Sequence, residues 1–274
     1  MVDKYAVLGN PIGHSKSPDI HAEFAKQTNQ EMTYEAILAP LDRFKETVTR
    51  LVSEGYKGVN VTVPFKFEAY DLASQLRMPA KQAGAVNTLT FTDGTLIGDN
   101  TDGLGLVHDI EHNLCKSLQS KRILILGAGG AAEGVLHPLL DAAPSKLVVA
   151  NRSVEKAVAM IGKVKQLVQY NSVSLAASAY EDLQNQKFDV VINATSTGLS
   201  DASLPIPNTL FADGSLAYDM MYGRETPFMA QAREAGATVA DGLGMLVEQA
   251  AEAFFIWRGV RPETASVMQK IRVQ

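Results

Sequence analysis

Three short segments near the start of the chain carry many polar side chains in otherwise apolar surroundings. They are residues 13–17, 60–66 and 100–102, and Asn87 lies between the last two. Their hydroxyls, amides, lysine and aspartate are suited to binding a small acid that carries several hydroxyl groups. Each segment also has an ordinary explanation. Ser17 and Asp102 are equally suited to capping a helix, and Lys66 to being a solvated lysine at a helix start.

The expected strand over residues 59–63 combines apolar and polar side chains. Its period of two puts Val59, Val61 and Val63 on one face and Asn60 with Thr62 on the other. A strand buried on both faces is normally apolar throughout. Two buried polar side chains therefore need partners, and a polar ligand at the carboxyl end of the sheet would supply them. An amphipathic strand with one face toward water is the alternative.

A glycine-rich loop further along is typical of dinucleotide binding. The apolar run over residues 122–126 predicts a buried strand that leads directly into Gly127-Ala128-Gly129-Gly130-Ala131-Ala132, and an apolar helix follows. In this pattern Gly127 permits the tight turn, Gly129 lets the backbone approach a pyrophosphate, and Ala132 lets helix and strand pack closely. The N–H groups at the start of the helix are suited to binding the phosphates.

The end of the next expected strand, residues 146–150, indicates which dinucleotide binds. NAD-dependent enzymes usually carry an acidic residue here for the ribose hydroxyls, whereas this chain has Asn151-Arg152-Ser153. A guanidinium can bind a 2′-phosphate through two parallel hydrogen bonds, and an aspartate would repel it. NADP is therefore the expected cofactor. A surface arginine in a loop is the alternative.

Composition narrows the class of protein. The 274 residues are 46% hydrophobic and 20% charged, which is typical of a globular protein. The net charge of −5 and the scattered basic residues argue against a nucleic-acid or membrane partner. Cys115 is the single cysteine, so neither an internal disulfide nor a thiolate metal site is expected. No signal peptide or membrane-spanning run is apparent, and a soluble, cytoplasmic protein is expected.

The order of elements predicts an α/β fold. Short β-branched runs alternate with helical periods, which favours largely parallel sheets. Asp93-Gly94 predicts a hairpin that joins residues 88–92 to 95–98. A polar stretch over residues 98–103 indicates a boundary, and near residue 240 the pattern changes to two helices. We therefore expect one domain of residues 1–102 with 241–274 and a second of residues 103–240.

The chain resembles the shikimate dehydrogenase family along essentially its whole length. The motifs that carry the resemblance are GNPIGHSKSP (9–18), NVTVPFK (60–66), GAVNT (84–88), GDNTDG (98–103), GAGGA (127–131), NATS (193–196) and DGLGMLV (241–247). The resemblance implies a substrate-binding α/β domain and a Rossmann-type NADP-binding domain that flank a cleft. It also implies reversible reduction of 3-dehydroshikimate to shikimate by NADPH, a step of aromatic amino acid biosynthesis. The expected protein acts on a small molecule and has no metal, and the sequence leaves open whether it is a monomer or a homodimer.

The resemblance also implies roles for individual residues. Lys66 and Asp102 match the catalytic pair, and Ser15 and Ser17 match positions that hold the substrate carboxylate. The other implied substrate contacts are Asn60, Thr62, Asn87, Tyr222 and Gln249. The implied cofactor contacts are Gly127, Ala128, Gly129, Gly130, Ala131, Asn151, Arg152, Ser153, Lys156, Thr195, Met220 and Gly242. Lys156 replaces a second arginine found in some members, and its point charge would make a softer phosphate clamp.

Ketone reduction needs a hydride on carbon and a proton on oxygen. Lys66 beside Asp102 is suited to polarising the carbonyl and to donating the proton. The sequence leaves open whether the lysine is the proton donor or an electrostatic anchor for a water relay. Three alternatives to this function remain: a quinate/shikimate dehydrogenase that uses NAD, a folate-pathway dehydrogenase of similar layout, and a non-catalytic ligand-binding module.

Overall fold

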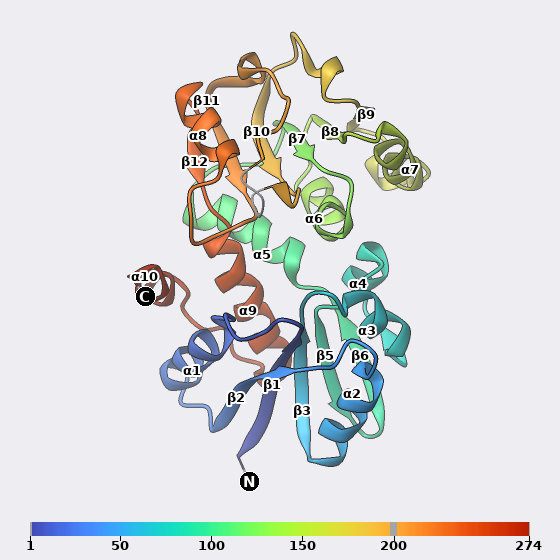
Figure 1. Cartoon of the computed structure of the whole chain (residues 1–274), viewed down its shortest axis with the longest axis vertical. Helices are drawn as coiled ribbons and strands as arrows, with labels where there is room; N and C mark the ends of the chain where they lie inside the picture. The colour runs from blue at the N-terminus through green and yellow to red at the C-terminus, as the bar shows by residue number, and fades with distance from the viewer. Residues whose placement is uncertain (1, 198–201, 274) are drawn as a thin grey trace. The chain divides into compact units, whose positions relative to one another are not determined.

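The computed structural model describes residues 2–197 and 202–273. It contains two compact units, each with one six-stranded sheet and helices (Figure 1). Unit 1 comprises Met1–Gly105 and Leu246–Gln274, and unit 2 comprises Leu106–Met245. The predicted α/β class with two largely parallel sheets is confirmed. Over the described ranges, no helix is long and apolar enough to cross a membrane.

The sheet of unit 1 has the strand order β2-β1-β3-β5-β6-β4. The strands are β1 (Asp3–Gly9), β2 (Met32–Leu38), β3 (Tyr56–Val61), β4 (Gln75–Leu76), β5 (Thr88–Thr92) and β6 (Thr95–Asp99). The first three are parallel, and β5 runs antiparallel to both β3 and β6. The expected hairpin is confirmed, with Asp93 and Gly94 both at positive φ in its turn.

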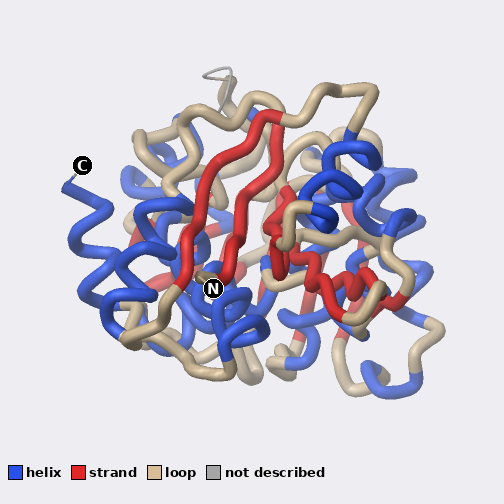
Figure 2. Tube along the Cα trace, turned by 90° about the horizontal axis from the view of Figure 1, so that it is seen from below, coloured by secondary structure: helices blue, strands red, loops and turns tan. Residues whose placement is uncertain are grey.

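Helices pack on both faces of this sheet (Figure 2). The elements are α1 (Ser17–Gln27), α2 (Phe44–Ser53), α3 (Lys66–Leu72), α4 (Met78–Ala83), α9 (Leu243–Arg258) and α10 (Ala265–Val273). On one face, Val59 and Val61 share a buried core with the side chains of α2, α3 and α4. On the other, Tyr5 of β1 stacks on Trp257 of α9, and Phe254 of α9 packs edge-on against Phe24 of α1.

The predicted strand over residues 59–63 is shifted. The strand begins at Tyr56 and ends at Val61, so Thr62 and Val63 follow it. Val63 is 67% exposed and does not join Val59 and Val61 in the core. The physical reason is Pro64, which has no N–H to donate to a strand ladder and therefore ends the pairing here.

The sheet of unit 2 is parallel throughout, in the order β12-β11-β10-β7-β8-β9. The strands are β7 (Arg122–Leu126), β8 (Lys146–Ala150), β9 (Ser174–Ser178), β10 (Phe188–Asn193), β11 (Phe211–Asp219) and β12 (Thr238–Ala240). The chain moves outward from β7 to β9 and then restarts at β10 on the other side. This is the doubly wound order of dinucleotide-binding folds, whose ligands bind at the carboxyl ends of the strands where the order reverses.

Successive side chains of β7 pack on opposite faces of this sheet. Ile123 and Ile125 pack with α6 (Gly130–Asp141) and α7 (Val154–Lys165), whereas Leu124 and Leu126 pack with α8 (Pro227–Glu234). Both faces are covered, which is why the strand is apolar throughout. The remaining elements are α5 (Asp102–His108), a π-helical turn (Asp109–Asn113) and the 3-10 turns Val168–Tyr170, Glu181–Leu183 and Asn208–Leu210.

Candidate active site

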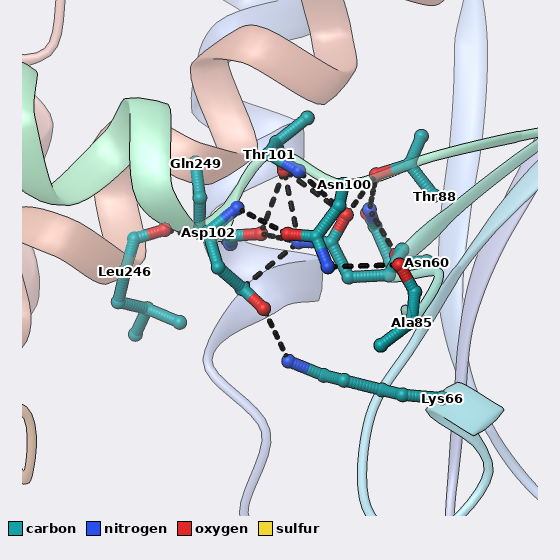
Figure 3. Close-up of polar contacts among 10 residues, drawn as sticks. Asn60, Lys66, Ala85, Thr88, Asn100, Thr101, Asp102, Leu246 and Gln249 are labelled. Carbon is teal, nitrogen blue, oxygen red and sulfur yellow. Dashed lines mark hydrogen bonds and ion pairs between the residues drawn. The ribbon is translucent and has the colours of Figure 1, made fainter. Parts of the chain in front are cut away.

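Lys66 and Asp102 form an ion pair in unit 1. Each is the first residue of a helix, Lys66 of α3 and Asp102 of α5. The Lys66 Nζ lies 2.6 Å from Asp102 Oδ2, and the two side chains are 30% and 18% exposed (Figure 3). An ammonium has three N–H donors. One of them meets Asp102, and the partial exposure leaves the group accessible to a ligand.

Asn87 holds the other oxygen of the same carboxylate. Its Nδ2 donates to Asp102 Oδ1 at 2.9 Å and to the Thr101 hydroxyl at 3.0 Å. Its Oδ1 accepts from the backbone N–H of Thr101 at 2.9 Å. The side chain is buried, and the Gln249 Oε1 lies 3.4 Å from Nδ2. Asp102 is therefore oriented from two sides, by Lys66 and by Asn87.

The two serines lie at the start of α1. The helix begins at Ser17 with Lys16 as its N-cap residue, so the N-cap explanation for Ser17 is wrong. The Ser15 hydroxyl accepts from the Ser17 N–H at 3.3 Å. Thr62 follows β3, and its N–H donates to the carbonyl of Leu8 at 2.9 Å. Ser15 and Thr62 thus lie in the segments that follow β1 and β3, and Ser17 is the first residue of α1.

Asn60 finds its hydrogen-bond partners inside the protein. Its Oδ1 accepts from the Tyr34 hydroxyl at 2.7 Å. Its Nδ2 donates to the Asn87 carbonyl at 3.2 Å and to the Thr88 hydroxyl at 3.0 Å. The residue is 7% exposed. The partners that the strand pattern required are therefore supplied by neighbouring elements.

Gln249 and Tyr222 belong to different units. Gln249 lies on α9 in unit 1, and its Nε2 donates to the carbonyl of Leu246 at 2.8 Å. Tyr222 follows β11 in unit 2 and is 37% exposed. Burial of part of its ring raises the pKa of Tyr222 above the usual value for a phenol, which keeps the hydroxyl protonated at neutral pH.

The glycine loop of unit 2 has the geometry that its sequence requires. Gly127 has φ +105°, and its N–H donates to the carbonyl of Ala150 at 2.7 Å. A Cβ at this position would lie 3.1 Å from both Ala194 O and Thr195 Cγ2. The N-cap residue of α6 is Gly129, which has no side chain to bind the first N–H groups of the helix. These groups are suited to a pyrophosphate.

The end of β8 carries the residues expected at the adenosine ribose. The Asn151 Oδ1 accepts from the Ala128 N–H at 3.2 Å, and its Nδ2 donates to the carbonyl of Ser153 at 2.9 Å. Asn151 therefore ties the glycine loop to the start of α7. Arg152 and Lys156 are exposed. A cationic side chain directly after β8 fits a dinucleotide that carries a 2′-phosphate.

Thr195 and Gly242, which are also cofactor candidates, each form a hydrogen bond within unit 2. The Thr195 hydroxyl donates to Asn193 Oδ1 at 2.7 Å, at the end of β10. The Gly242 N–H donates to the carbonyl of Met221 at 2.9 Å. A Cβ on Gly242 would lie 2.3 Å from the carbonyl oxygen of Met220, so only glycine fits there.

The sequence analysis did not identify Asp219, which bonds the carboxyl end of β11 to that of β10. Asp219, at the end of β11, is fully buried. Its carboxylate accepts from the Asn193 amide at 3.0 Å, from the Thr226 hydroxyl at 2.5 Å and from the Met221 N–H at 2.9 Å. An aspartate that ends an apolar strand was the available signal, because a buried carboxylate needs several donors.

The doubly wound sheet, the glycine loop and the cationic side chain after β8 together define a dinucleotide-binding α/β protein. The chain belongs to the shikimate dehydrogenase family. Family models match residues 7–89 (Shikimate dehydrogenase substrate binding domain), 109–200 (Shikimate / quinate 5-dehydrogenase) and 242–272 (Shikimate 5'-dehydrogenase C-terminal domain).

Relatives support the same assignment over the full length. Shikimate dehydrogenase (NADP(+)) of Methylobacillus flagellatus is 62% identical over 272 residues, 99% of each chain. An Ael1 enzyme from Pseudomonas putida is similar in structure, with a TM-score of 0.93, 47% identity and 99% coverage of both chains. Shikimate 5-dehydrogenase from Thermus thermophilus, in complex with NADP(H) and shikimate, has a TM-score of 0.86, 31% identity and 99% coverage of both.

Proposed function

We propose that the protein is an NADP-dependent shikimate dehydrogenase, which interconverts 3-dehydroshikimate and shikimate. The observation that carries the proposal is the Lys66–Asp102 pair, with its 2.6 Å contact and its partial exposure. The family membership and the shared length with NADP-dependent relatives support it. The cytoplasmic location and the choice between monomer and homodimer stay predictions of the sequence.

Lys66 acts on the ketone oxygen of the substrate. Reduction of a ketone adds a hydride to carbon and a proton to oxygen, and the nicotinamide supplies that hydride when the cofactor is bound. Lys66 donates a hydrogen bond to the ketone oxygen, stabilises the negative charge that develops there and releases a proton from Nζ to it. Asp102 keeps the ammonium oriented, and Asn87 in turn keeps Asp102 oriented.

The other polar residues bind and orient the substrate. Ser15 and Ser17 donate to the carboxylate, since hydroxyl donors bind an anion without adding a fixed charge. Thr62, Asn87, Gln249 and Tyr222 contact the ring hydroxyls. Asn60 supports substrate binding indirectly. Its amide donates hydrogen bonds to the Asn87 carbonyl and to the Thr88 hydroxyl.

Unit 2 binds the cofactor. The loop of Gly127 to Ala131 holds the pyrophosphate, and Asn151, Arg152, Ser153 and Lys156 bind the adenosine ribose with its 2′-phosphate. Met220 and Gly242 would line the nicotinamide, and Thr195 would be a further cofactor contact. The functional domains that we propose are residues 1–102 with 241–274 for substrate and residues 103–240 for NADP.

A four-way kinetic comparison tests the proposal. Oxidation of shikimate and of quinate is followed by reduced-nicotinamide absorbance, each with NADP⁺ and with NAD⁺. We expect turnover with shikimate and NADP⁺ to have the highest kcat/KM. A higher kcat/KM with quinate and NAD⁺ would assign the protein to the quinate/shikimate alternative. Absence of turnover from a folded protein that binds NADP⁺ would refute the substrate assignment.

A further inference from the structure

A buried chain of hydrogen bonds leads from the sheet to the Lys66–Asp102 pair. The Tyr34 hydroxyl donates to Asn60 Oδ1 at 2.7 Å, and Asn60 Nδ2 donates to the Thr88 hydroxyl at 3.0 Å. The Thr88 hydroxyl donates to Asn87 Oδ1 at 2.8 Å. Asn87 Nδ2 then donates to Asp102 at 2.9 Å. The bonds join β2, β3, β5 and the start of α5, all within unit 1.

The direction of every bond in this chain is determined. A backbone N–H can only donate, so the N–H of Thr101 identifies the facing atom of Asn87 as Oδ1. Nδ2 of the same amide must then face the carboxylate of Asp102, which can only accept when ionised. For Asn60, the backbone carbonyl of Asn87 can only accept, so Nδ2 faces it and Oδ1 faces Tyr34.

Two side-chain hydroxyls donate to Asn87 Oδ1, that of Thr101 at 3.3 Å and, at the shorter distance of 2.8 Å, that of Thr88. The Thr88 hydroxyl has a single proton. Because Asn60 Nδ2 already donates to the hydroxyl oxygen, that proton is directed to Asn87 Oδ1. Thr88 is fully buried and is the first residue of β5, directly after Asn87. Its side chain therefore stabilises one of the two orientations of the Asn87 amide.

We propose that Thr88 is a positioning residue for the Lys66–Asp102 pair and acts through the Asn87 amide. The proposal rests on the proposed function, in which Lys66 donates to the ketone. Loss of the hydroxyl removes one donor from Asn87 Oδ1 and one acceptor from Asn60 Nδ2. Rotation of the Asn87 amide then becomes less costly, and each rotation takes Nδ2 away from Asp102. The pair loses its orientation, whereas every proposed substrate contact other than the Asn87 amide stays in place.

Three variants test the proposal in the kinetic assay. Thr88→Val removes the hydroxyl at nearly constant shape, and Thr88→Ser retains it. Thr47→Val is the matched control, because Thr47 is also buried in unit 1 and its hydroxyl donates at 2.8 Å to the carbonyl of Arg43, the N-cap residue of α2. We expect Thr88→Val to lower kcat roughly 3- to 30-fold, as the loss of one hydrogen bond does, with KM changed less than about threefold. Thr88→Ser should stay near the parent, and so should Thr47→Val.

Other outcomes overturn the proposal. A kcat for Thr88→Val equal to that of Thr47→Val, or a fall of equal size in Thr88→Ser, would show that the hydroxyl has no role in positioning. If Thr88→Val does not fold, Tyr34→Phe removes the first donor of the chain and should lower kcat in the same sense by a smaller factor. An unchanged kcat in folded Tyr34→Phe would then refute the proposal.

A crystal structure separates this proposal from the proposed function. If the parent does not oxidise shikimate, the proposed function fails whatever the variants do. The distance between Asn87 Nδ2 and Asp102 Oδ1 still reports on positioning. We expect this distance to exceed the hydrogen-bond range in Thr88→Val and to stay near 2.9 Å in Thr88→Ser. An unchanged distance in both variants would contradict the proposal.

Discussion

At the scale of single residues, the cluster around Asp102 shows how a half-buried ion pair is kept in one geometry. A carboxylate that is 18% exposed has lost much of its hydration and needs donors on each oxygen. Lys66 and Asn87 supply one donor each. Asn87 is itself held by Thr88 and by the backbone of Thr101. The ammonium of Lys66 is thereby oriented before any substrate binds.

Substitution of Lys66 provides the prediction at this scale. We expect Lys66→Ala to lower kcat by roughly 10² to 10⁴, the usual effect of removing an acid–base group, with a smaller change in KM. Steady-state kinetics with shikimate and NADP⁺ measure both constants. Lys57→Ala is the matched control, because Lys57 is an exposed lysine of the same unit, and it should behave like the parent. A large rise in KM at unchanged kcat would instead assign Lys66 to substrate binding.

At the scale of elements, the glycine loop depends on two glycines for different reasons. Gly127 has a positive φ and lies close to the backbone of Ala194. Gly129 has φ −104°, and a Cβ added there would meet nothing within 4 Å. The first glycine is therefore needed by the fold, whereas the second leaves open space at the start of α6.

Two alanine variants distinguish these reasons. We expect Gly127→Ala to destabilise the protein by about 1–3 kcal/mol, since an L residue is strained at this φ, and to weaken NADP⁺ binding. Gly129→Ala should keep the stability of the parent and still weaken NADP⁺ binding, because the methyl group takes the space of the pyrophosphate. Denaturant unfolding and titration calorimetry measure the two effects. Normal NADP⁺ affinity in Gly129→Ala would contradict the assignment of this loop.

A second feature at this scale is the aromatic layer between β2, α1 and α9. His21 of α1 is fully buried and stacks on Tyr34 with ring centroids 4.0 Å apart. Phe254 and Trp257 of α9 lie against the same ring. Burial lowers the pKa of His21 from 6.5 to about 3, because a charged imidazole would lose its hydration there.

The lowered pKa of His21 makes the free energy of unfolding fall as the pH falls. Between pH 6.5 and about 3 the unfolded chain binds a proton at His21 and the folded chain does not, so stability falls as the pH falls. The contribution is about 1.4 kcal/mol per pH unit. We therefore expect His21→Phe to lose less stability than the parent between pH 7 and pH 4.5 in urea unfolding. His14→Phe, an exposed control in unit 1, should keep the slope of the parent. Equal slopes in all three proteins would refute the prediction.

At the scale of the whole molecule, each unit has a hydrophobic core of its own. One core surrounds β1, β3 and β5 in unit 1, and two cores cover the faces of the sheet in unit 2. The single tryptophan, Trp257, lies in unit 1 and stacks on Tyr5. Its fluorescence therefore reports the unfolding of unit 1, while far-UV circular dichroism reports both units.

Ligand-dependent unfolding tests whether the units unfold separately. A ligand at 100 times its Kd stabilises the part that binds it by about 2.7 kcal/mol. We expect NADP⁺ to raise the midpoint of the dichroism transition and to leave the midpoint of Trp257 fluorescence nearly unchanged, because its proposed site lies in unit 2. Shikimate without cofactor should raise the fluorescence midpoint. Equal shifts of both signals with NADP⁺ would show that the two units unfold as one.

Much of the architecture could be predicted because local patterns determine it. The β7 strand, the glycine loop and α6 follow one another in the sequence, and short-range sterics decide their geometry. The hairpin at Asp93-Gly94 is equally local. The prediction of β3 was wrong at its end, because the period of two continues through Val63 although Pro64 ends the pairing.

The class of fold, the family and the set of polar residues follow from the amino-acid sequence alone. Which of the polar atoms form hydrogen bonds with one another depends on the tertiary structure. Lys66, Asn87 and Asp102 are separated by up to 36 positions, and their hydrogen bonds depend on sheet register. Asn60 and Thr62 look equivalent in the strand pattern, yet the structure bonds the Asn60 amide to Tyr34, Asn87 and Thr88. The physical reason is that hydrogen bonds act over about 3 Å, and only the folded chain brings distant residues that close.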